Sequence, residues 1–302
     1  MLAGTAPARL AAVAAAGDAA AAAAAAADPV PPDPVPPDPV PPDPVPEVSI
    51  DRLCAEIGAS TATIAGLAGQ PDLTAAVPTC PDWTLRELAI HVGRAHRWAA
   101  EIVSTRSAEF IPFRSVPDGK FPAEPAERAA WLRAGADRLI GAVRGAGGDP
   151  VWAFGEMRPA SFWARRMAHE TAVHRADAEL AAGRVPDLDP ALAADAIDEW
   201  LCFLSGPIYG RPDPRADALP PGRSLHVHAT DDGLAGAGEW TVRADPAGVT
   251  VSGGHDKGDV AVRGPAARLL LVLLRRLPAD DPSVQVIGDA ATLSRWLERT
   301  PL

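Results

Sequence analysis

Apolar residues recur at intervals of three and four from about residue 48 to residue 204, which predicts a series of amphipathic helices. The expected helices span residues 49–68, 84–104, 124–144, 159–182 and 190–204. Prolines and glycines stand between them, where they are expected to separate one helix from the next. We therefore predict an all-α four-helix bundle over residues 48–205, with the last of these helices covering it.

The pattern changes after residue 222. Alternation of apolar and polar residues predicts strands over residues 223–229, 239–244, 248–252 and 259–263, and helical spacing returns over residues 265–277 and 289–299. Residues 206–222 hold five prolines and three glycines, a composition typical of an interdomain linker. The sequence thus predicts an α+β C-terminal domain with an antiparallel sheet over residues 223–302.

Residues 1–47 differ in composition from the rest. Nine consecutive alanines, Ala19–Ala27, precede a repeat of Asp-Pro-Val-Pro-Pro with a period of five residues. Such a segment buries too little apolar surface to offset its ordering entropy, so we expect a disordered tail. Its proline-rich half would be an extended spacer, with a proline-rich ligand for some partner as the alternative.

The clearest helix start lies at Thr84–Glu87, which reads as a capping box, with Trp83 and Leu88 placed as its hydrophobic staple. His91 falls within the apolar stripe of the helix that follows. A histidine there is either a hydrogen-bonded core residue or a ligand that faces into the bundle. His96 lies off the stripe and is expected at the surface.

Charge and cysteine content narrow the class of protein. The formal net charge is −11 without a run of Lys or Arg, which argues against nucleic acid and anionic membranes and favours a small-molecule ligand. Cys54, Cys80 and Cys202 include no CxxC pair, so neither a disulfide framework nor a thiolate zinc site is expected. No strongly apolar run approaches about 20 residues. We therefore expect a cytoplasmic protein.

Polar residues interrupt the buried face predicted for the helix over residues 159–182. At helical spacing this face carries Trp163, Met167, Glu170, His174, Asp177 and Ala181. Either Glu170 and His174 form an ion pair or turn toward solvent, or they join His91 around one divalent metal with positions left open. Asp177, one turn after His174, is placed to orient an imidazole rather than to bind the metal. Spacing alone leaves both readings open.

A resemblance favours the metal site. The segments Val77–Leu88 and His91–Arg94, and later Glu170–Asp177, closely resemble the mycothiol-dependent maleylpyruvate isomerase family. In the C-terminal half, Val262–Pro265 and Leu269–Arg276 resemble the C-terminal domain of the same family. The resemblance implies a DinB-like metal-binding bundle followed by a sterol-carrier-like α+β domain.

The same resemblance implies a chemistry and a ligand set. The metal ligands would be His91, Glu170 and His174, and the ion, most simply zinc, would hold mycothiol, the low-molecular-weight thiol of actinobacteria, as its thiolate. That thiolate would add to the double bond of maleylpyruvate and leave after rotation to give fumarylpyruvate, or would attack another electrophile in a related S-transfer. Arg276 matches a family arginine and is expected to hold a substrate or thiol anion, or else to snorkel at a helix end.

The sequence leaves open a non-catalytic role and a second metal site. A non-catalytic module would use the metal for structure or sensing and the C-terminal domain for an apolar ligand. His226 and His228 share one strand face and could bind a second metal, but no third ligand lies near them in sequence. Polar residues on an exposed strand face are the simpler interpretation.

Overall fold

The computed structural model describes residues 48–205, 218–245 and 248–300, which fall into two compact units that divide between Leu188 and Asp189. The tail predicted over residues 1–47 lies outside the described residues, as does most of the linker predicted over residues 206–222. Among the described helices, none combines the length and the apolar character needed to cross a membrane.

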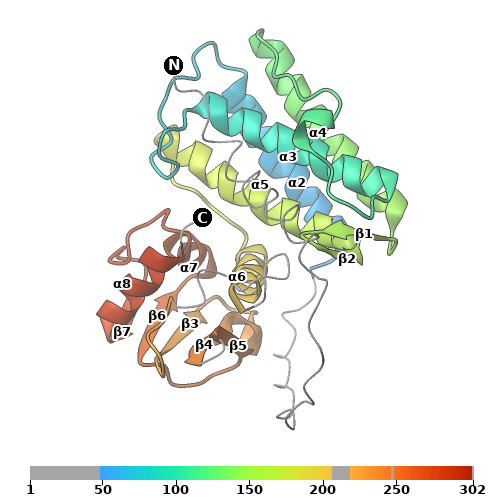
Figure 1. The fold of residues 1–302 in the computed structure, drawn as a ribbon. Coiled ribbons are helices and arrows are strands. Elements are labelled where there is room, and N and C mark those ends of the chain that lie inside the picture. Colours follow the sequence, from blue (N-terminus) through green and yellow to red (C-terminus); the bar gives the residue numbers. More distant parts are fainter. Residues whose placement is uncertain (1–47, 206–217, 246–247, 301–302) are drawn as a thin grey trace, which may run out of the picture. The chain divides into compact units, whose positions relative to one another are not determined.

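The first unit is the predicted four-helix bundle (Figure 1). Its helices are α2 (Ile50–Ala68), α3 (Leu85–Thr105), α4 (Pro125–Ala146) and α5 (Ser161–Ala181), all close to the ranges predicted from apolar spacing. Each packs against the others through its apolar face. A buried cluster fills the space between them and includes Ile64, Leu88, Val92, Trp131, Leu132 and Ala178.

The capping box at the start of α3 is present as predicted. The hydroxyl of Thr84 accepts a hydrogen bond from a backbone N–H of the first turn, and the Glu87 carboxylate accepts one from the Thr84 backbone at 3.1 Å. The preceding loop is fixed by backbone hydrogen bonds from Val77 N to Trp83 O at 2.9 Å and from Trp83 N to Cys80 O at 3.0 Å. The sequence thus fixes the loop that carries Cys80 and Trp83 against the start of α3.

Helices α3 and α4 approach each other closely at Gly93. A Cβ atom built at Gly93 would lie 2.0 Å from Cζ3 of Trp131, so only glycine leaves room for the indole ring. The buried guanidinium of Arg97 donates to the carbonyl oxygens of Gly93 at 2.9 Å and Trp131 at 2.7 Å. It also lies 4.0 Å from the centre of the Trp131 ring, a cation–π contact.

A hairpin that the sequence pattern did not predict joins α4 to α5. It consists of β1 (Pro150–Ala153) and β2 (Glu156–Pro159), paired antiparallel. Trp152 on β1 accepts a hydrogen bond at its carbonyl from the indole N–H of Trp163 at 2.9 Å and stacks edge-on against Trp98. The hairpin therefore brings a third tryptophan to the Trp98–Trp163 pair between α3 and α5.

The second unit holds a five-stranded sheet in the order β5-β4-β3-β6-β7 among the described residues. The strands are β3 (Ser224–Ala229), β4 (Glu239–Asp245), β5 (Gly248–Gly253), β6 (Val260–Gly264) and β7 (Gln285–Gly288). The α+β class is confirmed, but the sheet is mixed, because β3 and β6 pair in parallel while the other pairs are antiparallel. After edge strand β5 the chain crosses to the other side of β3, and β6 therefore runs parallel to β3. Strand β7 was not predicted from the sequence.

Helices cover the apolar face of this sheet, to which Leu225 and Val227 contribute. They are α6 (Pro190–Ser205), α7 (Ala266–Leu273) and α8 (Ala290–Arg299). Helix α6 packs against α7 and β5 and belongs to the second unit, so the expectation that it covers the bundle is wrong. Helix α7 is shorter than the predicted range of residues 265–277, because the chain turns at Arg275 with φ of 58°.

Candidate metal centre

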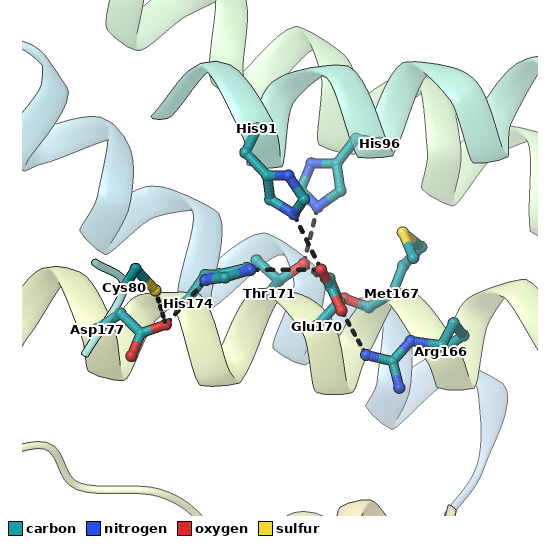
Figure 2. Close-up of polar contacts among 9 residues, drawn as sticks. All are labelled: Cys80, His91, His96, Arg166, Met167, Glu170, Thr171, His174 and Asp177. Atoms are coloured by element: carbon teal, nitrogen blue, oxygen red, sulfur yellow. Dashed lines mark hydrogen bonds and ion pairs between the residues drawn. The ribbon is translucent and has the colours of Figure 1, made fainter. Parts of the chain in front are cut away.

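Three predicted ligand side chains converge between α3 and α5. Figure 2 shows His91 from α3 pointing toward Glu170 and His174 from α5. Oε1 of Glu170 lies 3.0 Å from Nε2 of His91 and 3.3 Å from Nε2 of His174. One ligand atom from each residue can be chosen so that all lie within 4.8 Å of one another. Two imidazole nitrogens and one carboxylate oxygen thus face a common point, as a divalent metal site requires.

The local structure explains this convergence. Residues four apart share one face of a helix, so Glu170 and His174 project together from α5. Their side chains are only 19% and 10% exposed, so the alternative in which they turn toward solvent is wrong. An ion pair without a metal would use the same contacts, so only an experiment can distinguish the ion pair from the metal site.

Asp177 holds the ring of His174 from the other side. Its carboxylate, which is fully buried, lies 2.9 Å from Nδ1 of His174 and accepts hydrogen bonds from Thr79 Oγ1 at 2.6 Å and Cys80 Sγ at 3.4 Å. A proton on Nδ1 leaves the lone pair of Nε2 directed at Glu170. Contacts of this kind fix metal-binding imidazoles, and the role predicted for Asp177 toward a metal ligand stays a prediction.

The protonation of Glu170, His91 and His174 depends on the charges of their neighbours. Burial alone would raise the pKa of Glu170, but Arg166 and the two histidines outweigh burial and hold the pKa well below its usual value. Burial lowers the pKa of His91, which favours the neutral ring that a metal requires. Burial likewise opposes a proton on His174, but hydrogen bonds with Asp177, Cys80 and Glu170 raise its pKa well above the usual value. Without a metal, His174 therefore carries the compensating proton.

A second possible ligand group shares His174. Cys80, His174 and Asp177 also bring their ligand atoms together, a position for Cys80 that the sequence analysis missed. Both oxygens of Asp177 already accept hydrogen bonds and the side chain is fully buried, so an ion there would have to displace these bonds. Trp83 forms a wall beside the first group, with its ring centre 5.0 Å from that of His91 and 5.7 Å from that of His174.

The structure corrects the placement of His96. This residue was expected at the surface, but it is 1% exposed, and its Nε2 lies 2.8 Å from the hydroxyl of Thr171. Thr171 directly follows Glu170 on α5, so the pair ties α3 to α5 beside the candidate ligands (Figure 2). Burial is the main reason that the pKa of His96 falls to about 3, so the ring is neutral.

Arg276 lies in the second unit, in the turn that follows α7. Its Nη1 donates to the carbonyl of Leu274 at 2.8 Å, and its backbone N–H bonds to Leu271. The side chain is half-buried. Its role in holding an anion stays a prediction.

Comparisons with known proteins give the family and the fold of the chain. The family model described as mycothiol maleylpyruvate isomerase N-terminal domain matches residues 53–179, and the MDMPI C-terminal domain model matches residues 191–295. The fold is similar to crystal structures of the mycothiol-dependent maleylpyruvate isomerase and of a mutant of it, with TM-scores of 0.53 and 0.51 at 17% and 16% identity. Each alignment covers 80% of this chain and 93% of the other. Among curated proteins, none matches the sequence significantly.

Proposed function

The chain belongs to the mycothiol-dependent maleylpyruvate isomerase family, and we propose that it is a metal-dependent enzyme that uses mycothiol as its nucleophile. The observation that carries this proposal is the convergence of His91 Nε2, His174 Nε2 and Glu170 Oε1. Such a donor set suits zinc, and also iron, nickel or cobalt. We propose zinc.

A divalent ion held by these residues would lower the pKa of a thiol and keep it as the thiolate. The residues around the ligands support that role. Asp177 orients His174, and Arg166 pairs with the Glu170 oxygen that does not face the histidines. Trp83 shields the two imidazoles on one side, which limits their access to water.

The reaction we propose is a cis–trans isomerisation. The thiolate of mycothiol adds to the activated double bond of maleylpyruvate, the resulting single bond rotates, and elimination of the same thiolate gives fumarylpyruvate. The nucleophile is regenerated, so no protein nucleophile is needed. Arg276 is proposed to hold a carboxylate of the substrate or of the thiol, since a guanidinium binds carboxylates with two hydrogen bonds. S-transfer to another electrophile would use the same thiolate.

A cytoplasmic location is part of the proposal. Cys54, Cys80 and Cys202 form no disulfide bond with one another, as expected in a reducing compartment. Cys80 donates a hydrogen bond to Asp177, which in turn contacts His174, so oxidation of the Cys80 thiol would disturb the contacts beside the candidate ligands.

The test is an assay of purified, tag-free protein for conversion of maleylpyruvate, with and without mycothiol and after removal of metal by a chelator. We expect turnover that requires both mycothiol and metal and that returns when zinc is restored. His91→Ala should lose the metal ion of this site, one per chain, together with turnover, while the circular dichroism spectrum is kept. Metal bound without turnover on maleylpyruvate or another electrophile would favour the non-catalytic module.

A further inference from the structure

Three histidines surround one carboxylate on the polar face of the sheet in the second unit. His226 and His228 lie two residues apart on β3, so their side chains project from the same face. Strand register places His228 opposite Glu239, the first residue of β4. His255 comes from the loop between β5 and β6. Strand pairing therefore gathers residues that are distant in sequence.

The distances match those between ligands of one metal ion. Oε2 of Glu239 lies 2.7 Å from Nδ1 of His255, 3.1 Å from Nε2 of His226 and 3.8 Å from Nδ1 of His228. Ligand atoms of His226, Glu239 and His255 all lie within 4.8 Å of one another. Two ligands about 2.1 Å from a tetrahedral zinc ion are about 3.4 Å apart, which is close to the spacing seen here.

His226 supplies a buried nitrogen that faces the shared carboxylate. Its side chain is 6% exposed, and its Nε2 lies 3.1 Å from Oε2 of Glu239, the same oxygen that His255 and His228 approach. One carboxylate oxygen that serves three imidazoles satisfies each of them poorly, so a further ligand for the buried nitrogen is expected. His255, in contrast, is 75% exposed, which gives an ion access from solvent.

The loop that carries His255 is held in place on both sides of this residue. Asp256 forms an ion pair with Arg243 on β4. Gly258 packs so closely on β3 that a Cβ there would lie 2.9 Å from the backbone nitrogen of His226. Asp259 accepts hydrogen bonds from the backbone and hydroxyl of Ser224, each at 2.8 Å. His255 is thus positioned over the strands before any ion binds.

We propose that His226, Glu239 and His255 form a second divalent metal site in this chain, with zinc as its ion. His228 lies at the edge of the site as a further donor. The set of imidazole nitrogens and one carboxylate oxygen is typical of zinc ligands. The bound ion would tie the loop of residues 254–259 to β3 and β4. The site is built entirely within the second unit and does not depend on the function proposed for the bundle.

Zinc titration of the tag-free full chain, in competition with a chromophoric chelator, tests this site. The protein to use is the double variant His91→Ala/His174→Ala, which removes the ligands in the bundle. It should bind one zinc per chain, and zinc should raise its thermal unfolding midpoint, because an ion that binds only the folded state stabilises it. Adding His255→Ala or Glu239→Gln should weaken zinc binding at least about tenfold and abolish the rise in the midpoint.

Lys257→Ala is the matched control, because Lys257 is an exposed residue of the same loop and offers no ligand to the cluster. Added to the double variant, Lys257→Ala should leave its affinity for zinc unchanged. Folding of each protein is checked by circular dichroism, and the exposure of His255 makes its substitution safe for the fold. The proposal is overturned if the double variant binds no zinc, or if His255→Ala and Glu239→Gln leave its affinity unchanged.

Discussion

At the scale of single residues, Asp177 decides which nitrogen of His174 faces the other ligands. Its carboxylate lies 2.9 Å from Nδ1 of His174 and directs Nε2 toward Glu170. In Asp177→Asn the negative charge that favours a proton on Nδ1 is lost. We expect zinc affinity to fall about 10- to 100-fold, as measured by chelator competition.

Glu179→Gln makes the same change from carboxylate to amide two residues later on α5 and serves as the control. Its affinity for zinc should match that of the wild-type protein. Equal affinity of Asp177→Asn and wild type would show that Asp177 does not orient the ligand.

The sequence predicts the position of a side chain well where a single face of a single helix determines that position. Glu170 and His174 were placed correctly, since a spacing of four fixes their common face. His96 was misplaced because α3 contacts α2, α4 and α5, so more than one stripe of the helix is buried. Glu239 and His255 were not joined to His226 and His228, because they meet only through strand register and a loop, which local spacing does not encode.

At the scale of elements, the helices were predicted within a few residues because periodicity and the cap at Thr84 are local signals. The parallel pairing of β3 with β6 and the short strand β7 depend on contacts distant in sequence. Helix α6 looked like part of the bundle because its apolar spacing is the same whether it packs on helices or on a sheet.

The close approach of α3 and α4 gives a stability prediction. In Gly93→Ala the new methyl group would meet the Trp131 ring at 2.0 Å, so either the buried ring or the two helices must shift. The free energy of unfolding, measured with urea, should fall by about 1–3 kcal/mol.

Gly141→Ala is the matched control on α4. Outside the neighbouring residues and backbone of α4, no described atom lies within 4 Å of the added methyl group, so the substitution should raise the free energy of unfolding by about 0.5–1 kcal/mol. A Gly93→Ala protein as stable as wild type would contradict the packing described for this interface.

At the scale of the whole molecule, the chain combines a helical bundle with an α+β unit, each with its own cluster of histidines and a carboxylate. The cluster in the bundle matches the ligands expected from family resemblance. The cluster in the second unit was set aside on sequence grounds, and it is the structure that supplies Glu239 and His255. The metal in the function proposed here is held by the first cluster alone.

The most direct measurement of that central claim is anomalous diffraction at the zinc absorption edge from crystals of the purified protein. We predict a peak bonded at about 2.0 to 2.2 Å by Nε2 of His91, Nε2 of His174 and a carboxylate oxygen of Glu170. The absence of a peak between His91, Glu170 and His174 in zinc-saturated crystals, or a peak bound by Cys80 and Asp177 instead, would contradict it.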